Sequence, residues 1–192
     1  MADCPGATVL AHHDGTFEWG LEWYPEPPDW GSFAESYSGT GEVCGVAMYL
    51  TTSLGSSAAP DVYVWSSDGT SPDAVLAMVP EVDLGHVPYW PDFARYEVEI
   101  HARVQGQFFV GYWPWNYGGA ETYFILTDTE GERGMPRFKV PPGLPHWEEG
   151  WIDANEFFPE RDNHSLAFEA IIRLDSTPVA LSTWGRVKSM FR

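Results

Sequence analysis

Hydrophobic and polar residues alternate along several stretches of the chain, which is the pattern of strands that bury one face. The clearest stretch is 95–104, where Tyr, Val, Ile, Ala and Val alternate with charged side chains and a histidine. Residues 165–174 alternate nearly as well, with Leu166 and Phe168 beginning the apolar face. Both stretches therefore predict strands with one face in a core and the other in water.

Four further stretches have the composition of strands rather than of helices. Residues 43–52 and 61–67 are apolar on both faces, as expected of central strands. Residues 107–113 and 122–128 are rich in aromatic and β-branched side chains. The chain therefore contains at least six predicted strands.

Turn-forming residues separate these strands, and no helical periodicity of useful length lies between them. The turn signals are Asp68-Gly69, Gly118-Gly119, Glu130-Gly131 and Pro141-Pro142-Gly143. Such a series predicts an all-β fold, a two-sheet antiparallel sandwich of jelly-roll type. Residues 24–41 are polar and rich in Pro and Gly, and they predict a long surface loop.

The C-terminal stretch 182–192 has a different pattern. Apolar residues recur at helical spacing after the N-cap candidates Ser182 and Thr183, which predicts a short amphipathic C-terminal helix. It is the only basic stretch in an acidic chain. We predict one sandwich domain at residues 1–181 with this tail packed on it. A sorting or anchoring signal, or self-association through the tail, is the alternative.

Charge narrows the classes of partner. Ten basic and 28 acidic side chains give a formal net charge of −18, which argues against nucleic acid and anionic membrane surfaces as partners, because both need a basic surface. No stretch is apolar and long enough to span a bilayer, so no membrane insertion is expected. The opening MADCPG is typical of an initiator Met placed before a processed N-terminus, which favours secretion; a natural start is the alternative.

The chain has two cysteines, Cys4 and Cys44, which would pair in an oxidising compartment. A disulfide closing a loop of this length would stabilise the fold by about 4 kcal/mol. The alternative is that both are small, unlinked, buried side chains.

Four segments resemble a known group of modules. HHDGTFE near the start, DVYVWSSDGTSPDAVL (61–76), GQFFVGYW (106–113) and LAFEAIIRL occur in the order found in jelly-roll-like β-sandwich modules of secreted, multi-domain bacterial proteins. The tail resembles the T-W-G-x-[IV]-K-x-[LM]-[FY]-R endings of some of those proteins. The resemblance implies an extracytoplasmic, non-catalytic module and supplies no catalytic residues. The chain departs from the pattern between Val79 and Phe93, where extra aromatic and Pro residues occur.

Aromatic residues carry the prediction of a carbohydrate site. A saccharide needs a flat apolar ring for its C–H face and amide or carboxylate groups for its hydroxyls. The predicted site residues are Trp113, Trp115, Asn116, Tyr117 and Glu121, with Trp90 and Trp147 as additions. Strand 107–113 cannot expose both faces to water, so part of this stretch belongs in a core. Core and loop anchoring is the alternative for all of these rings.

Acidic loops carry the prediction of a metal site. Calcium accepts oxygen ligands in irregular loops, although no cofactor is required by the fold. The candidates are Asp14, Glu18, Asp128, Glu130 and Glu132. Solvated acidic turns are the alternative. His12 and His13 are neighbours that would point to opposite faces of a strand, so they would not share one ion.

Three functions remain open at this point. The first is a secreted, non-catalytic binding module that takes carbohydrate through exposed aromatic rings. The second is a structural or assembly subunit, such as a surface, adhesion or filament protein. The third is a glycoside-active enzyme that uses two carboxylates. Other enzyme classes have less support, because the sequence has neither the G-x-S-x-G elbow of nucleophilic hydrolases nor a phosphate-binding loop.

Overall fold

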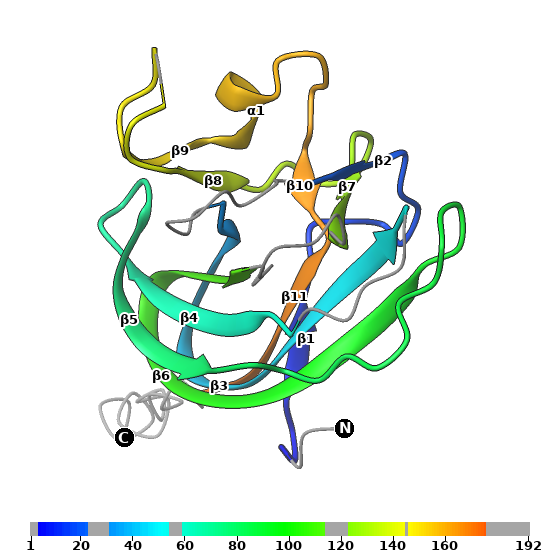
Figure 1. Ribbon diagram of the computed structural model, residues 1–192. Helices are drawn as coiled ribbons and strands as arrows, with labels where there is room; N and C mark the ends of the chain where they lie inside the picture. Colours follow the sequence, from blue (N-terminus) through cyan, green and yellow to red (C-terminus); the bar gives the residue numbers. More distant parts are fainter. Residues whose placement is uncertain (1–3, 23–30, 54–58, 114–122, 145, 176–192) are drawn as a thin grey trace, which may run out of the picture.

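Two strands of 20 residues each, β3 and β6, run side by side across the molecule (Figure 1). The computed structural model describes residues 4–22, 31–53, 59–113, 123–144 and 146–175. The described strands are β1 Thr8–Leu10, β2 Trp19–Leu21, β3 Phe33–Thr52, β4 Asp61–Ser67, β5 Pro72–Val79, β6 Ala94–Trp113, β7 Tyr123–Asp128, β8 Arg137–Val140, β9 Gly150–Asp153, β10 Ser165–Leu166 and β11 Phe168–Leu174. One short helix, α1 Ala154–Phe157, follows β9.

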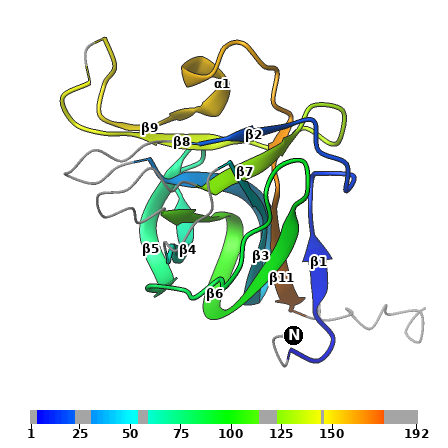
Figure 2. The same ribbon diagram turned by 45° about the vertical axis from the view of Figure 1, so that its right-hand side comes forward.

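The described strands form one antiparallel network that folds over itself in two layers. The order β1-β11-β3-β6-β4-β5 makes the first layer. The second layer contains β2, β7, β10 and the β8–β9 hairpin, seen across the top of the molecule in Figures 1 and 2. Strand β3 joins the layers, because Leu50–Thr52 pair with β7 and Phe33–Ala34 pair with β8. The predicted all-β antiparallel sandwich is therefore confirmed, with its two layers continuous through β3.

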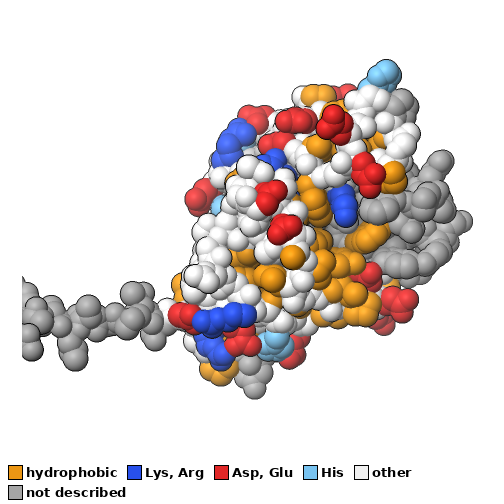
Figure 3. Space-filling view, turned by 90° about the vertical axis from the view of Figure 1, so that its left-hand side faces the viewer, with side chains coloured by type: hydrophobic (Ala, Val, Ile, Leu, Met, Phe, Trp, Pro, Cys, Tyr) orange, Lys and Arg blue, Asp and Glu red, His pale blue; other side chains and the backbone are white. Residues whose placement is uncertain are grey.

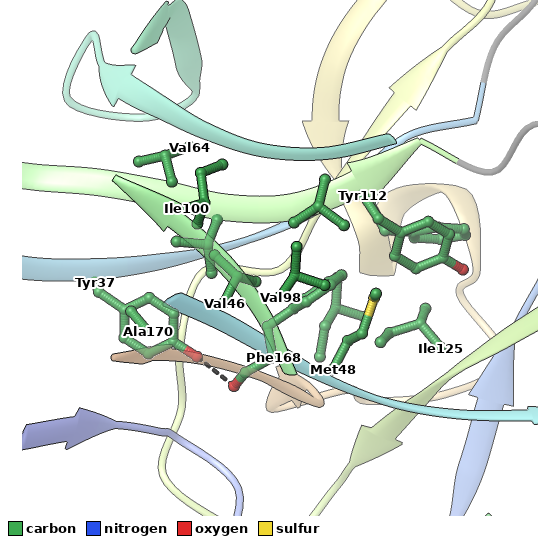
Figure 4. Close-up of a cluster of buried hydrophobic side chains, with 14 of the residues drawn as sticks. Tyr37, Val46, Met48, Val64, Val98, Ile100, Tyr112, Ile125, Phe168 and Ala170 are labelled. Atoms are coloured by element: carbon green, nitrogen blue, oxygen red, sulfur yellow. Dashed lines mark hydrogen bonds between the residues drawn. The ribbon is translucent and has the colours of Figure 1, made fainter. Parts of the chain in front are cut away.

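The main hydrophobic core lies between the two layers. Alternating residues of β6, such as Val98 and Phe108, meet Ile125 of β7, Phe138 of β8 and Phe168 of β11. Figure 4 shows part of this core, with the Tyr37 hydroxyl donating to the Phe168 carbonyl oxygen across 2.5 Å. The inward face of each alternating strand thus supplies one continuous core, as the sequence pattern indicates.

A second, smaller cluster lies on the opposite face of β4 and β6. It contains Ala34, Tyr63, Trp65 and Phe109, with Trp113 packed against its edge. The Tyr63 and Trp65 rings are stacked with centroids 4.9 Å apart. The prediction that part of strand 107–113 belongs in a core is therefore confirmed, and the second cluster also covers the other face at Phe109.

The predicted strands agree with the described strands in position, with two changes of length. Residues 95–104 and 107–113 belong to one strand, β6, and residues 165–174 divide into β10 and β11. The predicted C-terminal helix at 182–192 lies outside the described residues. Strand β5 follows the predicted Asp68-Gly69 turn, although the sequence pattern did not identify it as a strand.

The predicted surface loop at 24–41 is wrong for its second half. Residues 33–41 form the first half of β3 and pair with β6 and β11. The small residues in this half permit close approach of backbones: a Cβ on Gly41 would lie 2.2 Å from the Arg173 carbonyl oxygen. Glycine here meets a packing requirement of the sheet, whereas in the sequence it indicated a loop.

The predicted disulfide is confirmed. Cys4 and Cys44 are bonded, with their Cα atoms 6.1 Å apart, and the bond ties the segment before β1 to the middle of β3. Among the described residues, no helix has both the length and the hydropathy needed to cross a membrane.

Candidate functional site

Two surface grooves border the side chain of Trp19, which is 42% exposed. The Trp90 groove has a volume of about 240 Å³ and is lined by Trp19, Gly20, Thr51, Ser53, Trp90 and Phe124. The Phe157 groove has a volume of about 350 Å³ and is lined by Trp19, Gly20, Leu21, Phe157, Phe158, Pro159, Glu160 and Arg161. Trp19 is therefore shared by both grooves.

Backbone pairing fixes the position of Trp19. Strand β2 pairs with β7, which places Trp19 opposite Thr127. The next residue, Gly20, lies so close to β7 that an added Cβ would be 2.8 Å from the Cβ of Phe124. A larger side chain at position 20 would push β2 away from β7, so glycine here is needed for the groove to form.

A turn anchored on β3 fixes the position of Trp90, which is 49% exposed. The turn contains a cis peptide bond between Trp90 and Pro91. The Trp90 backbone N–H donates to the Thr52 carbonyl oxygen across 3.0 Å, and the Thr51 hydroxyl donates to the Asp92 carbonyl oxygen across 2.7 Å. These bonds hold an exposed aromatic ring on an ordered backbone, which reduces the entropy lost when a ligand binds.

Paired asparagines hold the wall of the Phe157 groove. The Asn163 backbone N–H donates to the Asn155 side-chain oxygen across 2.8 Å, and the Asn155 amide donates back to the Asn163 carbonyl oxygen across 3.0 Å. This exchange closes the loop that follows α1. The Phe157 ring then packs on Phe138 of the core, with centroids 4.5 Å apart. The wall is therefore a supported aromatic surface.

The two grooves combine apolar walls with polar rims. Their walls are mainly aromatic and aliphatic, and the polar groups at their rims include Ser53, Glu160 and Arg161. The Arg161 guanidinium carbon lies 3.3 Å from the centroid of the Trp19 ring, a cation–π contact. Half-exposed rings with a few hydrogen-bonding groups beside them match the requirements of a saccharide.

The structure places only part of the predicted carbohydrate site. Trp113 is half-buried against the smaller cluster beside Trp65. The other four residues of that prediction, Trp115, Asn116, Tyr117 and Glu121, lie outside the described residues. Of the two additions, Trp90 lines a groove, and Trp147 is 37% exposed and packs on Phe157 with centroids 4.8 Å apart.

Sequence reasoning missed Trp19, Phe157 and Arg161. A single Trp before Gly at the start of a three-residue strand has no periodic signal. Phe157 ends a four-residue helix, too short for a helical pattern to be visible. Trp19 meets Trp90 in one groove and Phe157 and Arg161 in the other, and it does so only through the pairing of β2 with β7 and of β7 with β3.

The calcium candidates cluster in part. The Asp14 backbone N–H donates to an Asp128 carboxylate oxygen across 2.9 Å, so the two loops lie side by side. The other Asp128 oxygen accepts from the backbone N–H groups of Glu130 and Gly131. Glu18 accepts from the Thr129 backbone N–H across 2.9 Å. Backbone donors thus occupy the central carboxylates.

The remaining two calcium candidates, Glu130 and Glu132, have exposed side chains. Within the described part of the chain, no group of three or more His, Cys, Asp or Glu side chains is placed to hold a metal ion. Calcium binding at these residues stays a prediction.

One buried carboxylate, Glu35, is held by backbone donors. It is fully buried and accepts from the backbone N–H groups of Ser36, Met135 and Leu166 across 2.7–2.9 Å. Burial raises the pKa of Glu35 to about 7, against the lowering effect of those three donors. Because the bonds from Met135 and Leu166 come from other segments of the chain, Glu35 is a structural link between β3, β10 and the segment before β8.

A second buried carboxylate, Glu169, belongs to a polar network on the outer face of β11. It accepts from the Tyr49 hydroxyl across 2.9 Å and from Arg95 across 2.7 and 2.9 Å. His13 lies 3.6 Å from the same carboxylate, and burial lowers the pKa of this histidine. Neither Glu35 nor Glu169 lines the two grooves at Trp19. Among the described residues that line the grooves, Glu160 is the one carboxylate, so these residues do not supply the pair that glycoside hydrolysis uses.

The chain matches no protein-family model, no curated protein and no solved structure. The resemblance to modules of secreted bacterial proteins therefore stays a prediction. The residues of the two grooves are then the observations that bear on function.

Proposed function

We propose that the protein is a non-catalytic binding module that holds a saccharide against Trp19 and Trp90. The observation that carries this proposal is a groove with an aromatic base between two half-exposed tryptophans whose backbones are hydrogen-bonded in place. The rings would cover the C–H faces of sugar units, and Ser53, Glu160 and Arg161 would meet hydroxyl groups.

An extracytoplasmic location belongs to the same proposal. The Cys4–Cys44 disulfide supports it, since such bonds persist mainly in oxidising compartments. The resemblance of the sequence to secreted modules points the same way. A secreted binding module on an acidic body would bind its ligand through the grooves and would repel polyanionic nucleic acid.

Titration against soluble and insoluble glycans tests the site. Each single substitution Trp19→Ala and Trp90→Ala should weaken binding about 5- to 150-fold, because stacking of one ring is worth about 1–3 kcal/mol in comparable aromatic sites. Phe93→Ala is the matched control, since Phe93 is 43% exposed but lines neither groove. A Trp113→Ala/Trp115→Ala double variant tests the site predicted from the sequence.

The possible results separate the two sites. Loss of binding only in the double variant would transfer the site to residues 113–121. An absence of binding to every glycan in the panel would contradict the carbohydrate proposal.

Assembly into a larger structure is the second candidate function, and strand β5 favours it. Among the described strands, β5 pairs only with β4, and its side chains Val75, Leu76 and Met78 are 54%, 41% and 45% exposed. Figure 3 faces the side of the molecule on which β5 lies in Figure 1 and shows a band of hydrophobic side chains there. Unpaired apolar edge strands are templates for pairing with another strand.

A second copy of the chain is the partner that fits β5. Residues 74–80 carry no charge in a chain whose net charge is −18, so antiparallel pairing of β5 with itself would bring no acidic groups together. Light scattering should detect a dimer of the full chain and a monomer for Leu76→Lys. A monomer for the full chain would exclude this assembly, and deletion of residues 182–192 tests association through the tail.

A further inference from the structure

Arg161 differs from the other arginines in the described part of the chain. Five of those arginines have a carboxylate partner: Arg95 with Glu97 and Glu169, Arg103 with Asp175, Arg133 with Asp162, Arg137 with Asp153, and Arg173 with Glu42. Arg161 has no carboxylate partner among the described residues; its side chain contacts Trp19. In a chain with 28 acidic and 10 basic residues, an arginine without such a partner needs an explanation.

The position of Arg161 leaves its hydrogen-bond donors available. The guanidinium carbon lies 3.3 Å from the Trp19 ring centroid, so one face of the guanidinium plane is covered by the ring. The five N–H donors of a guanidinium lie in its plane and point outward from its edge. Stacking therefore fixes the group without using the donors, which can still bind a carboxylate in bidentate geometry.

The wall beside Arg161 is apolar. Leu21 is buried, and Phe157 and Phe158 are half-buried, in the groove that Arg161 borders. A ligand that fits this combination has an apolar ring face and a carboxylate at its edge. Uronic acids, which are sugars with a carboxylate on the ring, have both features.

We propose that the Phe157 groove binds a carboxylate-bearing saccharide, with Arg161 pairing with the uronate carboxylate. This inference rests on the proposed carbohydrate function and specifies its ligand class. Glu160 lines the same groove and would accept hydrogen bonds from sugar hydroxyls. The net charge of −18 opposes the approach of an acidic ligand, but charges beyond about 8 Å are screened at physiological salt. The direct contact with Arg161 then decides whether the groove prefers the charged saccharide to a neutral one.

Paired ligands test this preference. The probes are trisaccharides of galacturonic, glucuronic and mannuronic acid and their methyl esters, in which a neutral ester group replaces the charged carboxylate. At least one acid should bind about tenfold more tightly than its ester, which corresponds to about 1.4 kcal/mol. Its affinity should fall between 50 and 500 mM NaCl, whereas the affinity of the ester should not.

Variants of the full chain assign the preference to one residue. Arg161→Gln should bind acid and ester equally, because the acid loses the ion pair that distinguishes it from the ester. Arg133→Gln is the matched control, because Arg133 is exposed but lines neither groove. Equal binding of acid and ester by the wild type would overturn this inference and leave the carbohydrate function standing. Failure of every probe and of the wider glycan panel would instead remove the carbohydrate function.

Discussion

Aromatic side chains have opposite environments in two regions of this molecule. On β6, Phe108 and Phe109 are 1% and 0% exposed and face two different clusters. Around the grooves, Trp19 and Trp90 are 42% and 49% exposed. The residue types are similar, but the end of β6 at residues 108–112 is covered on both faces, whereas β2 and the turn at Trp90 lie at the surface.

The difference shows that aromatic content alone does not indicate a ligand site. The rings of a covered strand are buried when the chain folds, so they stabilise the fold and have no apolar surface left to bury against a ligand. An exposed ring on a hydrogen-bonded backbone still has apolar surface that a ligand can bury. The candidate site of this protein is therefore the exposed pair, although the aromatic-rich stretch at 107–124 is more noticeable in the sequence.

The largest expected effect comes from removing a core ring. Phe108→Ala should lower the free energy of unfolding by about 3–5 kcal/mol, because a cavity remains between the layers. Urea denaturation followed by tryptophan fluorescence measures this change. Phe93→Ala, at a ring that is 43% exposed, is the matched control and should cost less than about 1 kcal/mol. Equal losses in both variants would contradict the distinction between the two regions.

Carboxylates extend the comparison, since Glu35 lies in the core and Glu160 at a groove rim. Burial raises the pKa of Glu35 to about 7 from an ordinary value of 4.5. The folded protein therefore binds this proton more tightly than the unfolded chain does. The resulting stability is fully present below pH 4.5 and is lost as the pH rises through about 7, by on the order of 3 kcal/mol.

Comparison with Glu35→Gln isolates this effect. The variant cannot titrate at this position, and its amide N–H₂ must face backbone donors, so it should be less stable than the wild type at every pH. His13 and the other groups titrate in both proteins and cancel in the difference. The stability advantage of the wild type should shrink between pH 4.5 and 8. A constant advantage across this range would show that Glu35 does not change its protonation.

The smallest expected effect on stability comes from the exposed rings. Trp90→Ala should change the free energy of unfolding by less than about 1 kcal/mol, because the turn is held by backbone groups and by the Thr51 hydroxyl. Urea denaturation measures stability, and glycan titration of the same sample measures binding. A loss of several kcal/mol would mean that Trp90 is a structural anchor and would weaken the case for a binding site.

Particular strands show how far the sequence predicts the fold. Strand β4 has the predicted bounds, because its ends are marked by polar residues and an Asp-Gly turn. The first half of β3 was predicted as a loop, since its serines and glycines have no hydrophobic alternation. Its strand conformation depends on pairing with β6 and β11, whose residues are more than 60 positions away.

The candidate site was less predictable than the fold. Trp90 was named from its residue type alone, whereas Trp19 and Arg161 became visible only when β2 paired with β7. The acidic loops show the same limit: the sequence could name Asp14 and Asp128 but not their hydrogen bond across 114 residues.

By itself, the sequence determined the strand class and the burial of part of residues 107–113, because both depend on local alternation and on residue type. It supplied two cysteines, and the structure decided that they are bonded. Only the tertiary structure decided which aromatic rings reach the surface and which lie together. Exposure of a ring depends on what the neighbouring layer covers, and that is a property of long-range pairing. The grooves at Trp19 exist because β2, β7, the end of β3 and the loop after α1 converge there.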